Sequence, residues 1–238
     1  MKRRLFQGLL FAALLCGAVL LAHPTAAWAL DGTGSKEDPY QISSAADLQA
    51  FAGKVNSGER TANAVLTTDI NLNGIESDPW TPIGDSSNRY TGTFDGKGHT
   101  ISGLYINSDA KYVSLFGYIG TNGTVKNLTL ADSSINSRSS GNYAFVGGIC
   151  GYNYKGSITN CHNSGSVAYT GSGVGYGYEV GGICGENDGS IENCSNSGTV
   201  TGSDRSDVGG ICGWNDGSIT NCSNSGTFTG SGSGSKVG

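Results

Sequence analysis

The stretch VGGICGENDGSIENCSNSGTV, from Val180 to Val200, returns almost unchanged as VGGICGWNDGSITNCSNSGTF from Val208 to Phe228. Its opening, Val-Gly-Gly-Ile-Cys-Gly, also occurs at Val146, so successive copies begin 34 and 28 residues apart. Self-similarity at such a period is typical of repeat architectures, in which each unit packs on its neighbours. The repeat therefore decides the fold.

A degenerate copy lies upstream of Val146. There the segment 115–128 aligns with 149–161, and Phe116 and Leu128 occupy the positions of Cys150 and Cys161. The last residues, Lys236 to Gly238, begin what would be a further copy. We therefore expect the repeats to cover 111–238 and to be truncated at their C-terminal end.

Each copy contains short apolar runs separated by turn residues such as Asn-Asp-Gly and Asn-Ser-Gly, which predicts about three strands in 28 residues. An Asn-Asp-Gly turn can close an antiparallel hairpin. The near-identity of the copies instead favours parallel rungs about 4.8 Å apart, because like residues then stack on one another. We therefore expect an all-β fold, a β-solenoid rather than a series of hairpins.

Asparagine recurs at fixed positions of the repeat. Stacked asparagine side chains can hydrogen-bond along a ladder and satisfy the backbone of turns, so we interpret them as structural rather than as ligand-binding. The two sets are Asn127, Asn160, Asn193 and Asn221, and Asn163, Asn196 and Asn224.

The first 29 residues have the features of a signal peptide: basic residues at Lys2 to Arg4, an apolar run from Leu5 to Leu21, and a small-x-small site at Ala27-Trp28-Ala29. An uncleaved membrane anchor is the alternative. No second apolar stretch follows, so no membrane insertion is expected after signal removal. The chain carries a net charge of −5, or −8 without those three basic residues, which argues against nucleic acid as a partner.

Residues 43–55 interrupt the β pattern. Ser43 or Ser44 can cap a short helix whose apolar residues Leu48, Phe51, Ala52 and Val55 fall on one face. Because a solenoid needs its first rung covered, we expect this helix to form an N-terminal lid, with a partner-binding helix as the alternative. Residues 30–110 would then hold the cap and the first rungs.

Gly-Gly-Ile-Cys-Gly-x-Asn, Gly-Ser-Ile-x-Asn-Cys and Asn-Ser-Gly-x-Val resemble the GLUG repeat of bacterial extracellular and surface proteins. The upstream segments Asp38–Ile42, Asp69–Leu72, Trp80–Gly84 and Thr91–Leu104 resemble the region that commonly precedes such repeats. The resemblance implies a right-handed parallel β-helix like that of pectin lyases, within a longer surface protein, and no particular reaction. Cysteine stands at position 150 and its repeats where Val or Ala is more usual.

Catalytic residues are sparse. Polysaccharide chemistry on a β-helix needs clustered carboxylates, or carboxylates with calcium and a base. The concentrated candidates are Asp69, Asp78, Asp85, Asp95 and His99, while the repeats add chiefly Glu186, Asp188, Glu192 and Asp216. Asp95 to His99 is typical of a tight turn, and Asp188 and Asp216 lie in Asn-Asp-Gly turns. We therefore assign no catalytic residue, no metal ligand and no cofactor.

Two further hypotheses concern the repeats. The copy at Val146 is six residues longer than the next, and its Gly-rich excess carries Tyr169, Tyr176 and Tyr178, which could contact a ligand if exposed or could pack back on a rung. The six cysteines after residue 29 could form disulfides within each repeat or remain buried free thiols. The within-repeat pairs are Cys150 with Cys161, Cys184 with Cys194, and Cys212 with Cys222.

The sequence thus predicts an exported, non-catalytic β-solenoid, secreted or at the cell surface, that serves as the N-terminal part of an adhesin or as a structural stalk. A host or environmental glycan or protein is the expected ligand, and a monomer the expected state. The alternative is a polysaccharide lyase or glycosidase on the same fold, because fold alone does not decide function.

Overall fold

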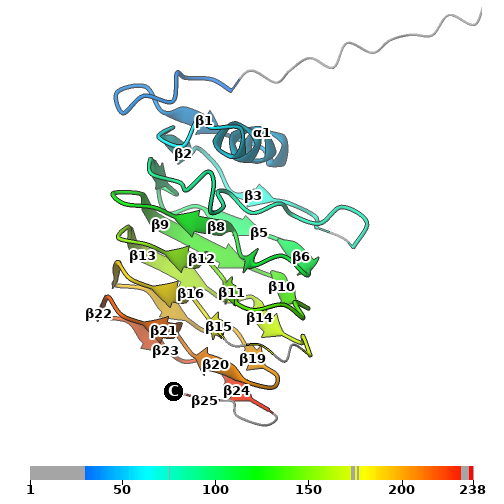
Figure 1. Ribbon diagram of the computed structural model, residues 1–238. Coiled ribbons are helices and arrows are strands. Elements are labelled where there is room, and N and C mark those ends of the chain that lie inside the picture. Colours follow the sequence, from blue (N-terminus) through cyan, green and yellow to red (C-terminus); the bar gives the residue numbers. More distant parts are fainter. Residues whose placement is uncertain (1–29, 75, 173–174, 176, 232–235, 238) are drawn as a thin grey trace, which may run out of the picture.

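The chain forms a flattened coil whose turns stack on one another, with a helix across one end (Figure 1). The computed structural model describes residues 30–238 except 75, 173–174, 176, 232–235 and 238, so the predicted signal peptide over 1–29 lies outside the described residues. The strands of the described part make parallel pairs in four sheets, and the coil has about five turns. The predicted β-solenoid is confirmed.

The largest sheet runs along the whole coil and holds eleven of the described strands. They are β1 (Tyr40–Ile42), β2 (Ala64–Leu66), β3 (Ile70–Asn71), β4 (Thr93–Asp95), β5 (Thr100–Ser102), β9 (Thr124–Ala131), β13 (Ser157–Asn163), β17 (Ser190–Glu192), β18 (Ser195–Asn196), β22 (Ser218–Thr220) and β23 (Ser223–Asn224).

The other three sheets of the described residues complete each turn. The first contains β6 (Tyr105–Ser108), β10 (Ser134–Ser137), β14 (Ser166–Tyr169), β19 (Val200–Gly202) and β24 (Phe228–Gly230). The second contains β7 (Tyr112–Val113), β11 (Ala144–Gly147), β15 (Tyr178–Gly181), β20 (Ser206–Gly209) and β25 (Lys236–Val237). The third contains β8 (Phe116–Ile119), β12 (Cys150–Asn153), β16 (Cys184–Asn187) and β21 (Cys212–Asn215).

Like residues of successive repeats are in register. Val146 pairs with Val180 and Val180 with Val208, while Phe116 of the degenerate copy pairs with Cys150. The hairpin interpretation of the Asn-Asp-Gly turns is therefore wrong: the turn after β16 leads into β17 of a different sheet. Each turn also contains shorter and more numerous strands than the three expected.

One asparagine set explains why the strands are short. Asn127, Asn160, Asn193 and Asn221 have φ values of 54°, 52°, 52° and 53°, in the left-handed region. Asparagine tolerates this conformation better than most residues, so it recurs where the chain must bend within a rung. The side chains also form part of the expected ladder, since Asn160 Nδ2 donates to Asn127 Oδ1 at 3.0 Å.

Two further asparagine ladders are buried. Asn163 Nδ2 donates to Asn196 Oδ1 at 2.9 Å, and Asn196 Nδ2 to Asn224 Oδ1 at 2.8 Å. The sequence analysis did not single out the second ladder, in which Asn153 donates to Asn187 and Asn187 to Asn215, both at 2.7 Å. The buried amides, those of Asn153, Asn163, Asn187 and Asn196, thus join one rung to the next where water cannot do so.

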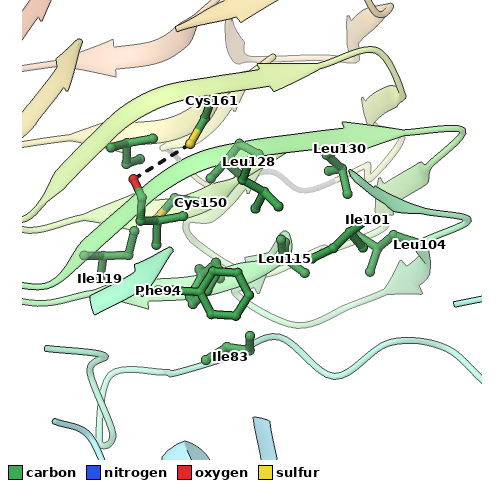
Figure 2. Packing of buried hydrophobic residues seen from close by; sticks show 14 of the residues in the cluster. Ile83, Phe94, Ile101, Leu104, Leu115, Ile119, Leu128, Leu130, Cys150 and Cys161 are labelled. Carbon is green, nitrogen blue, oxygen red and sulfur yellow. Dashed lines mark hydrogen bonds between the residues drawn. The ribbon is translucent and has the colours of Figure 1, made fainter. Parts of the chain in front are cut away.

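Apolar side chains fill the coil from all four sheets. Figure 2 shows part of this packing, between the largest sheet and the sheet that contains β8 and β12. The helix α1 (Ala45–Asn56) closes the N-terminal end: Ser44 caps it by accepting from Asp47 N–H, and Leu48, Phe51, Ala52 and Val55 are buried as expected. Phe51 contacts the ring of Phe94 in β4 at 5.7 Å between centroids. The helix is therefore a lid on the first rung; the boundary at residue 110 stays a prediction.

The six cysteines after residue 29 are free thiols arranged in two columns. Cys150, Cys184 and Cys212 are in register in one sheet. In the other column, Cys161 N–H donates to Cys194 Sγ and Cys194 N–H to Cys222 Sγ, each at 3.4 Å. The two cysteines of a repeat lie on different sides of the coil, so each thiol packs against its counterpart in the next rung.

Asn187→Ala should lower the free energy of unfolding by about 1–3 kcal/mol, because it leaves the buried amide of Asn153 without its acceptor. Asn136→Ala is the control: Asn136 donates to Asn107 and Thr170 on a half-exposed surface, where water can replace the lost bonds. Urea denaturation of both variants measures the difference. Equal losses would contradict a special role for the buried ladder.

Thiol labelling of the folded protein should spare Cys150, Cys161, Cys184 and Cys194, which are buried, and reach Cys212 and Cys222 first, because these two are partly exposed. Unfolding without reductant should then allow all six to be alkylated. Peptide mapping by mass spectrometry reads out each site. A linked pair of peptides in the unreduced sample would overturn the thiol columns.

Candidate functional site

The sheet that contains β11 and β15 meets the sheet that contains β12 and β16 at a tight inward corner, which is formed by glycine residues. A Cβ atom on Gly185 would lie 2.7 Å from both Gly151 O and Val146 N, and one on Gly151 would lie 2.8 Å from Gly117 O. Only glycine allows the strands before and after the corner to approach so closely. Side chains that point outward from these two strands therefore meet across the corner.

Because the turns are in register, a pair of outward side chains faces each other across the corner in every turn. Tyr112, Phe145, Glu179 and Asp207 form one column along β7, β11, β15 and β20. Tyr118, Tyr152, Glu186 and Trp214 form the facing column along β8, β12, β16 and β21. We call these eight residues, together with Tyr143 beside Phe145, the corner face.

The first half of the corner face is aromatic. Tyr112 and Tyr118 face each other with ring centroids 5.4 Å apart, and Phe145 stacks on Tyr152 at 5.3 Å in the next turn. The chain places its own cations on these rings: the Arg89 guanidinium lies 4.8 Å from the centroid of Tyr118. The Lys111 ammonium lies 5.1 Å from the centroid of Phe145. Burial raises the pKa of Tyr118 to about 12, so its hydroxyl stays neutral.

The second half is acidic, because Glu179 and Glu186 take the places that Phe145 and Tyr152 hold one turn earlier. Burial, followed by the charge of Glu186, raises the pKa of Glu179 to about 8. Burial, followed by the charges of Asp188 and Asp216, raises the pKa of Glu186 to about 7. Both carboxyls therefore exchange protons in the neutral range, far above a glutamate in water.

A hydrogen bond joins the aromatic half of the corner face to the acidic half, and one carboxyl oxygen of the acidic half has no hydrogen-bond partner within the described residues. The Tyr152 hydroxyl donates to Asp188 Oδ2 across one turn. Glu179 is 7% exposed, and within the described residues no donor reaches its Oε2 atom. A buried acceptor without a partner is costly, and Asn153 Oδ1 inside the coil shares this state. The Glu179 oxygen differs because it lies beside the half-buried Glu186, where it can accept a bond from a bound group.

The tyrosines predicted to contact a ligand lie elsewhere. Tyr169 and Tyr178 are each 1% exposed and stack on each other at 4.6 Å, so of the two alternatives the rings pack back on a rung and are not exposed. Their hydroxyls donate to the carbonyls of Ser139 and Gly141, which lets the rings close the core between β14 and β15. Tyr176 lies outside the described residues.

The acidic candidates of the N-terminal region do not assemble into a catalytic cluster in the described part of the chain. Asp69 accepts from Thr100 N–H and contacts His99 Nδ1 at 3.1 Å on an exposed edge; the bond from Thr100 is the first cause of its lowered pKa. Asp95 accepts from Lys97 N–H within the turn between β4 and β5, as expected for a tight turn. Asp85 likewise accepts from the backbone of its own turn.

A cavity of about 500 Å³ lies between α1 and residues 72–81, and Asp78 and Trp80 line it. Its polar groups are largely committed to the fold. Trp80 Nε1 donates to Leu115 O, while the Asn56 side chain donates to Pro82 O and accepts from Gly84 N–H. The bonds of Asn56 connect the C-terminal end of α1 to the segment that contains Pro82 and Gly84.

The sequence analysis named Glu186 among the acids of the repeats but missed Glu179 and the aromatic column beside it. The signal was the spacing of the repeats, since Phe145, Glu179 and Asp207 precede three copies of Val-Gly-Gly-Ile-Cys-Gly by one residue. Within the described ranges, no group of three His, Cys, Asp or Glu could hold a metal ion, and no helix has the length and apolar character to cross a membrane.

Comparison with known proteins identifies the same repeats that the sequence pattern indicates. The model of the GLUG motif matches residues 146–168, 176–201 and 204–229. A relative from Evansella cellulosilytica named "Putative Gly-rich membrane protein" is 41% identical over 128 residues, which cover 52% of this chain and 14% of the relative. Halomucin of Haloquadratum walsbyi is 40% identical over 114 residues, 44% of this chain and 1% of halomucin. The chain thus spans a small part of the length of either relative.

One solved structure shares the architecture. It is described as that of a "putative immunoglobulin A1 protease" from Bacteroides ovatus, with a TM-score of 0.58 and 21% identity, covering 87% of this chain and 77% of that one. At this identity the likeness shows the β-helix fold alone.

Stability should fall as pH rises through the neutral range. The folded-state pKa values of Glu179 and Glu186, about 8 and about 7, lie above the ordinary value of 4.5, so the folded protein binds more protons than the unfolded chain between about pH 4.5 and 8. Denaturation across this range should show a steeper loss for the protein than for the double variant E179Q/E186Q. The exposed carboxyl of Glu192 provides the control Glu192→Gln; parallel profiles for all three proteins would contradict the raised pKa values.

Proposed function

We propose that this chain, which carries three GLUG motifs on a parallel β-helix, is a non-catalytic adhesive module of the cell surface that binds its ligand along the corner face. The rungs are a rigid support, and the ligand-binding side chains are those that point away from the core. The molecule acts as a monomer, exposed outside the cell or on its surface.

The observation that carries this proposal is the continuity of the corner face over four turns. Aromatic rings and carboxyls stand in two facing columns, and neither column belongs to the core cluster. Tyr143, in the second turn of the face, is 50% exposed, and Trp214, in its last described turn, is 42% exposed. Exposed rings of this size are typical of surfaces that bind sugars or proteins.

The names of the relatives agree with a surface role. One is named "Putative Gly-rich membrane protein" and the other "Halomucin", and neither name describes a reaction. The described part of this chain contains no membrane-spanning helix. Labelling of intact cells with an antibody against the protein tests this location, with a cytoplasmic protein as the negative control.

Binding should depend on the two exposed rings of the corner face. We expect at least one probe in a panel of neutral, acidic and amino glycans, mucin, fibrinogen and lysozyme to bind the protein, and the double variant Y143S/W214S to bind about tenfold or more weakly. Biolayer interferometry at neutral pH measures the affinity. The control Tyr105→Ser removes a half-buried ring on β6, in another sheet, and should bind normally.

Two results would contradict the proposal. The first is a panel in which no probe binds the folded protein. The second is a probe whose affinity is the same for the protein and for Y143S/W214S. Thermal melting of each variant separates a loss of contacts from a loss of fold.

A second candidate function follows from the two facing carboxyls. A general acid must hold its proton at the working pH, and the pKa values of Glu179 and Glu186, about 8 and about 7, meet that condition. A polysaccharide hydrolase would use such a pair on opposite sides of a glycosidic bond. An assay for new reducing ends over a range of polysaccharides decides between the two functions: turnover that E179Q abolishes would replace the adhesive role.

A further inference from the structure

The acidic half of the corner face carries more negative than positive charge. Four carboxylates raise the pKa values of Glu179 and Glu186, while Lys111 lowers both. The groups that raise them are Glu186, Asp188, Asp207 and Asp216. A ligand that brings positive charge therefore lowers the electrostatic cost of ionising Glu179 and Glu186.

The unpaired Oε2 atom of Glu179 restricts the kind of cation. A quaternary ammonium has no hydrogen to donate, whereas a guanidinium offers five N–H groups in a planar fork. Glu186 is half-buried and so reachable from solvent, and Glu179 lies beside it with 7% exposure. A donor-bearing cation can therefore bind Glu186 directly, while the neighbouring charge of Glu179 adds to the attraction.

The other half of the same face shows that it accommodates a guanidinium. Arg89 lies over Tyr118 of the corner face and over Tyr154 beside it, 4.8 Å and 5.5 Å from the two ring centroids. The rings that flank Glu186 occupy equivalent positions, because Tyr152 is in register with it one turn before and Trp214 one turn after. Planar guanidinium groups stack on such rings more readily than ammonium groups do.

We propose that the acidic half of the corner face binds an arginine side chain of a basic protein segment, with the guanidinium on Glu186 between the rings of Tyr152 and Trp214. This inference rests on the proposed function, since it names the ligand class of the same surface. Charge complementarity favours it: the chain is acidic overall, with a net charge of −5, and this half of the face gathers five carboxyl groups within two turns.

Arginine binding should be linked to the release of protons. Arginine keeps its charge at any pH near neutrality, whereas Glu179 and Glu186 must lose protons to become its counter-ions. Affinity should therefore rise between about pH 6 and pH 8, the range that contains the pKa values of about 7 and about 8, and then level off. A purely structural pair of carboxyls would leave the affinity independent of pH.

The test uses a fluorescent peptide, Gly-Arg-Gly-Arg-Gly, and an analogue in which citrulline replaces both arginines. Citrulline keeps the shape of the side chain but has no charge. Fluorescence anisotropy with the protein should show the citrulline peptide binding about tenfold or more weakly, the factor expected from one hydrogen bond between charged groups. Glu186→Gln should cause a similar loss, Glu179→Gln should flatten the pH profile, and Glu192→Gln should change neither.

Competition separates the possible failures. Equal affinity for the arginine and citrulline peptides would overturn this inference. So would a neutral or uronic acid oligosaccharide that binds the protein more tightly than the arginine peptide does and loses affinity when Glu186 is replaced by Gln. Either result leaves the proposed function intact if the Y143S/W214S variant still has a lower affinity than the unchanged protein for the ligand that does bind. Absence of binding by every peptide and every panel probe would overturn both. Near-native melting temperatures for the Gln variants confirm that the losses are local.

Discussion

The register of the parallel rungs is the constraint on which the rest of the structure depends. Every repeat places the same residue over the same residue, so a feature that works in one turn extends through the next. A slip of one residue would turn side chains from the core face to the solvent face. The buried asparagine ladders oppose such a slip, because a shifted strand would leave several amides without partners.

The register limits which side chains can occupy positions inside the coil, whereas positions on its outer surface can vary widely. The core columns repeat valine, isoleucine and cysteine, which fill the narrow coil at each turn. The outward columns at the corner change from tyrosine and phenylalanine to glutamate, aspartate and tryptophan without disturbing the backbone. The corner face is therefore where one repeat differs chemically from another, and where a scaffold can carry a specific site.

Much of the fold could be predicted from the sequence because it follows from local repetition. The spacing of Val146, Val180 and Val208 predicts stacking, and the pattern Leu48, Phe51, Ala52 and Val55 predicts the capping helix. The site was harder to predict, because two residues seven apart, such as Phe145 and Tyr152, meet only through the glycine corner. For Tyr169 and Tyr178 the sequence left two alternatives open, because a Gly-rich segment does not reveal whether the rings at its ends turn into the core.

A crystal structure of the protein would test the central claim most directly, because it would show the register residue by residue. The account predicts parallel strands about 4.8 Å apart, with Glu179 in register with Phe145 and Asp207 and facing Glu186 across the corner. Antiparallel pairing between successive repeats would contradict it. So would a one-residue shift in β15 or β16 that removes either carboxyl from the corner.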